Sequence, residues 1–217
     1  MDVFVATPSY DEWFCMEYTS SLMETAVRLT LAGVGVYHSV APGNPFLEIA
    51  RNQLVEKFLA TDAENLLFVD ADVGWDAKAV LRVLKAPHEV VGGLVPKRDA
   101  KKDDVYHMNA LTGGRDDFLL EAIEIPTAFM RIKRSVFEKW QKLNAGVPYF
   151  GRGPSPHSTN PRDTGEDIWF CREWVHMGGT MWVDPDITFS HRGGKAWKGN
   201  FWDHCVNSGL VKSVEAA

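Results

Sequence analysis

The sequence predicts an α/β fold with a mostly parallel central sheet flanked by helices, and three observations lead to it. Strands and helices alternate over residues 2–95, which is typical of a parallel sheet. Four apolar residues in a row, Leu66-Leu67-Phe68-Val69, suit a strand that is buried on both faces. Residues 105–132 contain short strand-like pieces with no helix between them, which predicts a smaller mixed-strand part. A length of 217 residues suits one domain.

The first half of the chain is predicted to alternate regularly. Its elements are, in order, a strand over 2–7, a helix over 16–32, a strand over 34–40, a helix over 46–60, the strand that ends at residue 69, a helix over 76–85 and a strand over 89–95. The first helix has an apolar stripe of Leu22, Ala26, Leu29 and Ala32. The second is expected to bury Phe46, Ile49, Leu54 and Phe58.

The second half is less regular. A strand over 128–132 leads into a helix over 134–143, and a further helix over 166–177 is followed by a strand near 181–184. The segment 146–165 between them is rich in Gly, Pro, Ser and Asn, so we expect a long loop that acts as a lid over a ligand.

Composition excludes several classes of protein. The formal charge of −6 argues against a protein coated in nucleic acid, although a local basic strip is still compatible with it. The three cysteines are scattered and odd in number, which indicates neither a disulfide framework nor a zinc site. No signal peptide is evident, and no apolar run is long enough to cross a bilayer. We therefore expect a cytoplasmic protein.

The most informative motif is a pair of carboxylates that follows the apolar strand. Because side chains alternate along a strand, Asp70 and Asp72 leave its end on the same side, with Ala71 turned away. Two like charges this close repel unless a divalent cation or a shared proton lies between them. Ligands of open α/β sheets bind at this edge. The pair therefore indicates either a metal site for a phosphate-bearing ligand or a solvated turn with Asp72 near a helix cap.

Three further positions have both a structural and a functional interpretation. Glu166 and Asp167 begin a helix, where carboxylates either complement the helix dipole or act as a general base. His191 follows a strand and precedes two glycines, so it is either structural or a partner of the aspartate pair around manganese. Arg51 is either a surface charge or a contact to a phosphate or nucleoside.

Taken in order, these segments resemble the GT-A glycosyltransferases, especially the family-two-like members of bacteria and their viruses. The resemblance extends from residue 3 to about residue 193. The matching segments are Ala6-Thr7-Pro8-Ser9-Tyr10, Ala50-Arg51-Asn52, Phe68-Val69-Asp70-Ala71-Asp72, Gly92-Gly93-Leu94-Val95-Pro96-Lys97, Ala128-Phe129-Met130 with Arg134-Ser135-Val136-Phe137, Gly165-Glu166-Asp167 with Phe170-Cys171, and His191.

The resemblance implies a single GT-A-like domain, with a nucleotide-binding half over 1–95 and an acceptor-binding half over 96–217. Mn²⁺ or Mg²⁺ would be held by Asp70, Asp72 and His191 against the diphosphate of a nucleotide sugar, with UDP favoured. Asp167 would be the base, with Glu166 beside it. The resemblance assigns the donor to Thr7, Pro8, Tyr10, Arg51, Asp70, Ala71, Gly93 and Lys97, with Gly92 and Gly93 admitting the sugar close to the backbone.

The acceptor is less well defined. Cys171-Arg172-Glu173-Trp174 matches the signature of processive enzymes only in part, so we expect single transfer to a soluble acceptor, with inversion or retention open. A glycan or small molecule is the first expectation. Hydroxymethylated DNA of a virus, modified in the host cytoplasm, is the second. It would use two basic clusters with interleaved aromatic residues, made up of Lys97, Arg98, Lys101, Lys102, Arg192, Lys195, Trp197, Lys198, Phe201 and Trp202.

Two other functions compete with transfer of a sugar. A sugar-phosphate nucleotidyltransferase usually has a glycine-rich basic loop after its first strand, whereas here that position has Asp11 and Glu12. A module that binds a nucleotide sugar without catalysis would not need every one of the expected carboxylates, all of which are present.

Overall fold

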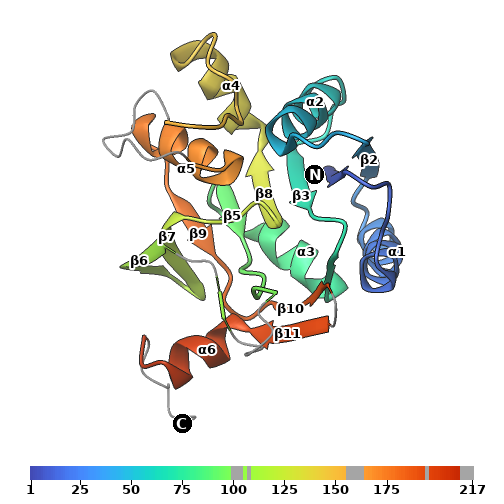
Figure 1. Ribbon diagram of the computed structural model, residues 1–217, viewed down its shortest axis with the longest axis vertical. Helices are drawn as coiled ribbons and strands as arrows, with labels where there is room; N and C mark the ends of the chain where they lie inside the picture. Colours follow the sequence, from blue (N-terminus) through green and yellow to red (C-terminus); the bar gives the residue numbers. More distant parts are fainter. Residues whose placement is uncertain (99–104, 107–108, 155–163, 194–195, 211–217) are drawn as a thin grey trace.

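The computed structural model describes residues 1–98, 105–106, 109–154, 164–193 and 196–210. They form one eight-stranded sheet in the order β2-β1-β3-β8-β5-β9-β7-β6, shown in Figure 1. Only β8 and β7 run against the rest, so six of the eight strands share one direction. The predicted α/β class, a mostly parallel sheet flanked by helices with a smaller mixed-strand part, is confirmed.

The strands of the large sheet have the following bounds: β1 Val3–Ser9, β2 Val36–Pro42, β3 Asn65–Val69, β5 Val90–Gly92, β6 Asn109–Asp116, β7 Leu119–Glu124, β8 Phe129–Lys133 and β9 Met181–Val183. Strand β8 lies between β3 and β5, so strands from residues 1–95 and 96–217 interleave in one sheet. Strand β5 ends at Gly92, three residues before the predicted end at residue 95.

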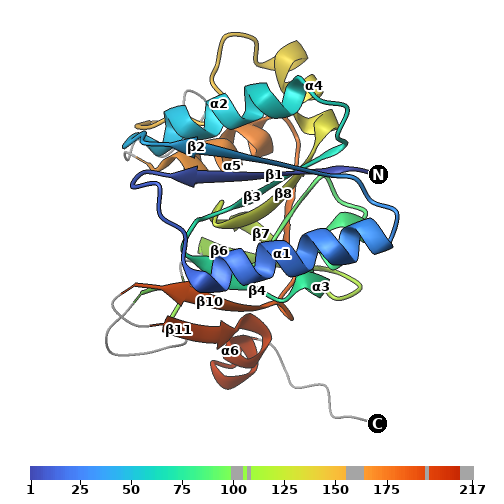
Figure 2. The same cartoon turned by 90° about the vertical axis from the view of Figure 1, so that its right-hand side faces the viewer.

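Helices cover both faces of this sheet, as Figure 2 shows. On one face lie α2 (Leu47–Leu59), α4 (Arg134–Leu143) and α5 (Glu166–His176), and on the other lie α1 (Met16–Leu31) and α3 (Ala77–Lys85). Because side chains alternate along a strand, successive strand residues enter two different hydrophobic cores, one on each face of the sheet. Leu66 and Phe68 of β3 enter the first, and Leu67 and Val69 enter the second.

Two of the predicted helix faces are wrong in detail. In α2, Phe46 and Ile49 are exposed, whereas Arg51 is buried. In α1 the buried positions are Tyr18, Ser21, Thr25 and Leu29, so only Leu29 of the predicted stripe is buried. Ser21 and Thr25 are buried in α1 because both form hydrogen bonds with Trp75. The hydroxyl of Ser21 bonds the backbone of Trp75, and the hydroxyl of Thr25 accepts a hydrogen bond from its indole nitrogen.

A second sheet was not predicted. It contains β11 (Ala196–Asn200), β10 (Thr188–Arg192) and β4 (Val73–Trp75), and α6 (Phe201–Asn207) follows it. Each strand has at most five residues, which is too short for a clear period in the sequence. This sheet brings His191 opposite Val73, one residue after the aspartate pair.

The predicted lid falls partly outside the described residues. Residues 155–163 are not described, and Gly153 and Thr164 on either side of them pair through two backbone hydrogen bonds. The role of this loop as a lid stays a prediction.

Packing between the two sheets leads to a prediction about Gly93. A Cβ at this position would collide with Cζ of Phe189, whose buried ring packs against Phe129 and would have to shift. We expect Gly93→Ala to lower the free energy of unfolding by about 1–3 kcal/mol. The measurement is urea unfolding in wild-type and Phe189→Leu backgrounds. The cost should shrink in the second, and an equal cost in both would contradict this account.

Candidate active site

The candidate site lies where parallel strands end on one edge of the large sheet. Strand β3 ends at Val69, and Asp70 follows it at the edge where the neighbouring β1 also ends. Helix α5 begins with Glu166 and Asp167 at the same place, as the contacts of Arg51 demonstrate.

Arg51 joins these two groups of carboxylates. Its Nη2 lies 2.9 Å from Oδ1 of Asp70, and its Nε lies 3.1 Å from Oε1 of Glu166. The residue is 1% exposed, and its guanidinium lies over the ring of Phe68. Burial acts to lower the pKa of Arg51, but the two carboxylates outweigh it and the pKa is raised. Arg51 is therefore not a surface charge, and it positions the two carboxylates, while its predicted contact to a phosphate or nucleoside stays a prediction.

Asp72 has different partners from Asp70. Its Oδ2 lies 3.4 Å from Nε2 of His191 and 2.9 Å from Nη1 of Arg98. Burial acts to raise the pKa of Asp72, but the hydrogen bond and charge of His191, together with Arg98, leave it lowered. The sequence correctly placed His191 beside the pair. The contact with Arg98 was not predicted.

The tautomer of His191 follows from its second contact. Its Nδ1 lies 2.6 Å from the carbonyl oxygen of Pro96, and because a carbonyl only accepts, Nδ1 carries the proton. In the neutral ring Nε2 is then an acceptor that faces the carboxylate of Asp72. Two facing acceptors require a cation or a proton between them. Burial opposes the charged ring, yet Asp72 raises the pKa of His191 overall.

These atoms fit a divalent cation in part. A carboxylate oxygen and an imidazole nitrogen suit Mn²⁺, and the bond from Nδ1 to Pro96 orients the ring as a ligand. Asp70, however, directs one oxygen at Arg51 rather than at His191. Within the described ranges no group of three or more His, Cys, Asp or Glu side chains is placed to hold a metal ion. Asp72 and His191 are the protein ligands that the geometry brings together.

Asp167 has the carboxyl group best suited to accept a proton. Burial and the neighbouring charge of Glu166 raise its pKa to about 6, while the backbone N–H of Ile168 and the charge of Arg51 act in the opposite direction. Its Oδ1 accepts that N–H at 2.8 Å. Glu166 is occupied by Arg51, so the two acidic residues differ in role.

The residues assigned to the nucleoside differ in their access to solvent. Thr7 is fully buried, and its hydroxyl lies 2.6 Å from that of Tyr18, which in turn contacts His38. Pro8 is buried as well, whereas Tyr10 is 64% exposed. Burial raises the pKa of Tyr18 to about 12, so its hydroxyl keeps its proton. Of the three predicted contacts, only Tyr10 presents its side chain to solvent.

The remaining donor residues have structural partners. Ala71 is partly exposed, and its carbonyl accepts the N–H of Cys15. Lys97 donates its N–H to Val105. Gly92 and Gly93 are buried, and the space beside them is taken by backbone of β8 and by Phe189. Packing is sufficient to explain both glycines, and the approach of a sugar to them stays a prediction.

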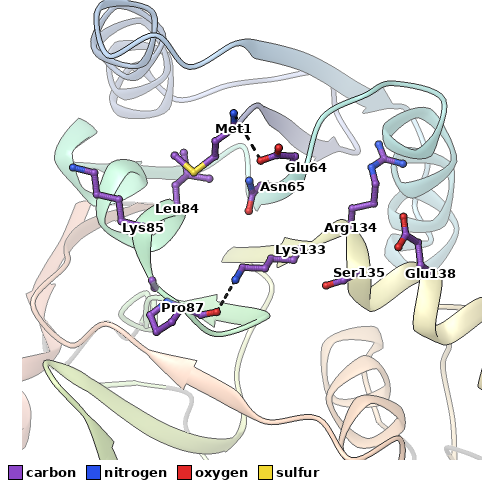
Figure 3. A pocket seen from close by; sticks show the side chains of 11 residues that line it. Met1, Glu64, Asn65, Leu84, Lys85, Pro87, Lys133, Arg134, Ser135 and Glu138 are labelled. Carbon is purple, nitrogen blue, oxygen red and sulfur yellow. Dashed lines mark hydrogen bonds and ion pairs between the residues drawn. The ribbon is translucent and has the colours of Figure 1, made fainter.

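A pocket of about 520 Å³ lies at the opposite end of the sheet, shown in Figure 3. It includes Asn65, the first residue of β3, whereas Asp70 follows the last. Lys133 donates to the carbonyl of Pro87, and Glu64 pairs with the amino group of Met1. This pocket is therefore separate from the carboxylates.

Comparison with known proteins gives a relationship of fold. No protein-family model matches the chain, and no curated protein matches it. Protein A197 from STIV is similar with a TM-score of 0.56 and 17% identity, over 89% of this chain and 86% of that one. At this identity the similarity shows the fold alone.

Two other solved structures are less similar. TarS 1–349 from S. aureus, in complex with UDP-GlcNAc, has a TM-score of 0.48 and 14% identity, over 84% of this chain and 56% of that one. The inositol-1-phosphate CTP transferase from T. maritima has a TM-score of 0.47 and 8% identity, over 87% and 88%. Of the helices in the described residues, none has the length and apolar character needed to span a membrane.

The buried position of Arg51 predicts a large effect on stability. Arg51→Met leaves Asp70 and Glu166 unpaired in a largely buried place, so we expect the free energy of unfolding to fall by about 3 kcal/mol. Urea unfolding would measure it. The matched control is Arg28→Met, which breaks an exposed pair with Glu24 and should cost about 0.5 kcal/mol or less. Similar losses in both variants would contradict the role given to Arg51.

Proposed function

We propose that this protein is a glycosyltransferase that moves a sugar from a nucleotide-sugar donor to a hydroxyl group of an acceptor. The observation that carries the proposal is the double ion pair of Arg51. It holds Asp70, two residues before the proposed cation ligand Asp72, against the start of the helix that carries Asp167, whose pKa of about 6 suits a base. The GT-A-like architecture, a mostly parallel sheet with its carboxylates at one edge, agrees with this chemistry.

Asp72 and His191 are the proposed protein ligands of the cation. Bound Mn²⁺ or Mg²⁺ would act as a Lewis acid and neutralise the leaving diphosphate. Asp70, held by Arg51, has its other oxygen free to orient the donor. UDP is the nucleotide expected from the resemblance to GT-A enzymes, and Tyr10 is the exposed side chain proposed to contact its nucleoside.

Asp167 is the proposed general base. Above pH 6 its carboxylate is ionised and accepts the proton of the acceptor hydroxyl as that oxygen attacks the sugar. Glu166 acts as a positioning residue, because its carboxylate is occupied by Arg51 and its charge raises the pKa of its neighbour.

The contacts of the basic clusters favour a glycan or small-molecule acceptor over DNA. Arg98 and Arg192 are paired with Asp72 and Glu17, and Phe201 is buried against Tyr106. The buried ring of Phe201 is therefore not available for stacking on an extruded base, and the carboxylates beside the two arginines offset positive charge that a DNA backbone would contact. Lys101, Lys102, Lys195 and the side chain of Trp197 lie outside the described part of the chain.

The first test is release of UDP from UDP-sugars with Mn²⁺. We expect Asp167→Asn to lower turnover by about 10²–10⁴-fold while UDP still binds, because the amide cannot accept a proton. Asp62→Asn, an exposed change of the same kind, is the control and should behave as wild type. Binding of nucleotide without turnover would indicate a binding module. Release of pyrophosphate from a nucleoside triphosphate and a sugar phosphate would indicate a nucleotidyltransferase.

The second test is the pH dependence of the rate. Because the base must be deprotonated, kcat/KM should rise with pH and level off above a midpoint near pH 6. Glu166→Gln removes a neighbouring negative charge, so the midpoint should move to lower pH. A profile that is flat between pH 5 and 7 in wild type, or one that Glu166→Gln leaves in place, would exclude Asp167 as the base.

A further inference from the structure

Arg98 occupies the position of a cation at the candidate site. Its Nη1 lies 2.9 Å from Oδ2 of Asp72, the same oxygen that faces Nε2 of His191 at 3.4 Å. The guanidinium therefore places positive charge next to the carboxylate oxygen that also faces His191. The sequence analysis placed Arg98 only in a basic cluster proposed to bind the acceptor. That role does not explain its contact with Asp72.

The two arginines of the site, Arg51 and Arg98, differ in how firmly their side chains are held. Arg51 is enclosed and bonded to two carboxylates, so it stays in place. The side chain of Arg98 is 51% exposed and has its ion pair with Asp72 alone among the described contacts. Exposed pairs of this kind are weak and are readily exchanged for other partners.

A divalent cation would compete with the guanidinium of Arg98 at Oδ2 of Asp72. Both are positive, so a cation held by this oxygen would repel the guanidinium that now lies 2.9 Å from it. His191 need not move, since the carbonyl of Pro96 fixes its ring. Arg98 is therefore the group that must leave when a cation enters.

The donor offers Arg98 a new partner. A diphosphate bound to the cation brings negative oxygens to within a few ångströms of Asp72, and a guanidinium binds phosphate through two parallel hydrogen bonds. We infer that Arg98 is a donor-binding residue that pairs with Asp72 in the free protein and transfers to the diphosphate when the cation and nucleotide bind. This inference rests on the proposed function.

The exchange predicts opposite effects on two affinities. In Arg98→Gln no guanidinium competes for Asp72, so Mn²⁺ alone should bind more tightly, by about 5-fold. The same variant lacks the phosphate contact, so UDP should bind more weakly at saturating Mn²⁺, by about 10-fold. A purely structural role for the ion pair would not produce opposite signs.

Isothermal titration of the whole chain with Mn²⁺, and then with UDP at saturating Mn²⁺, measures both effects without activity. Arg192→Gln is the matched control, since it removes the same charge from a similarly exposed pair with Glu17. It should leave both constants within about 2-fold of wild type. Thermal unfolding of each variant verifies that it is folded.

The outcomes separate the inference from the function on which it rests. Wild-type protein that binds no UDP would overturn both. Wild-type protein that binds Mn²⁺ and UDP, with Arg98→Gln unchanged in either constant or indistinguishable from Arg192→Gln, would overturn the inference and leave the proposed function standing. Tighter Mn²⁺ and weaker UDP in Arg98→Gln only is the expected result.

Discussion

The site depends on a buried arginine between two carboxylates. Enclosing a guanidinium costs free energy that only well-placed anions offset, and Asp70 and Glu166 meet that requirement from two elements far apart in the chain. Because the pair partners come from the end of β3 and the start of α5, Arg51 fixes the distance between them.

The carboxylates of the site carry more negative charge than Arg51 offsets. Arg51 compensates only one of the two carboxylates that it touches, and Asp167 and Asp72 add more negative charge close by. One consequence is the raised pKa of Asp167. The other is at Asp72, whose carboxylate pairs with Arg98 and faces the ring of His191.

Local patterns in the sequence were sufficient for the main elements and for part of the site. The apolar run before Asp70 and the alternation of strands and helices predicted the large sheet, and the period of two placed both aspartates at its edge. The position of His191 near Asp72 was also anticipated. The prediction of which helix residues are buried was less successful. Hydrophobicity assigned Ile49 to the core, but Ile49 is exposed and Arg51 is buried instead. Arg51 is buried because it pairs with Glu166, a residue too far away in the sequence for a local pattern to reveal.

The other omissions have the same origin. The contact of Arg98 with Asp72 joins the segment after β5 to the turn between β3 and β4, and the Thr7–Tyr18 hydrogen bond joins β1 to α1. Such contacts depend on the tertiary arrangement and leave no periodic trace in the chain. Phe189 is similar, since its packing against Gly93 follows from a second sheet whose strands are too short to predict.

The most direct measurement of this account is a crystal structure of the protein with Mn²⁺ and UDP. The account predicts an ion on Asp72 and His191 that contacts the diphosphate, with Arg51 still between Asp70 and Glu166 and Asp167 facing the nucleotide. An ion and nucleotide bound elsewhere, or Arg51 withdrawn from its two carboxylates while the nucleotide is bound, would contradict it.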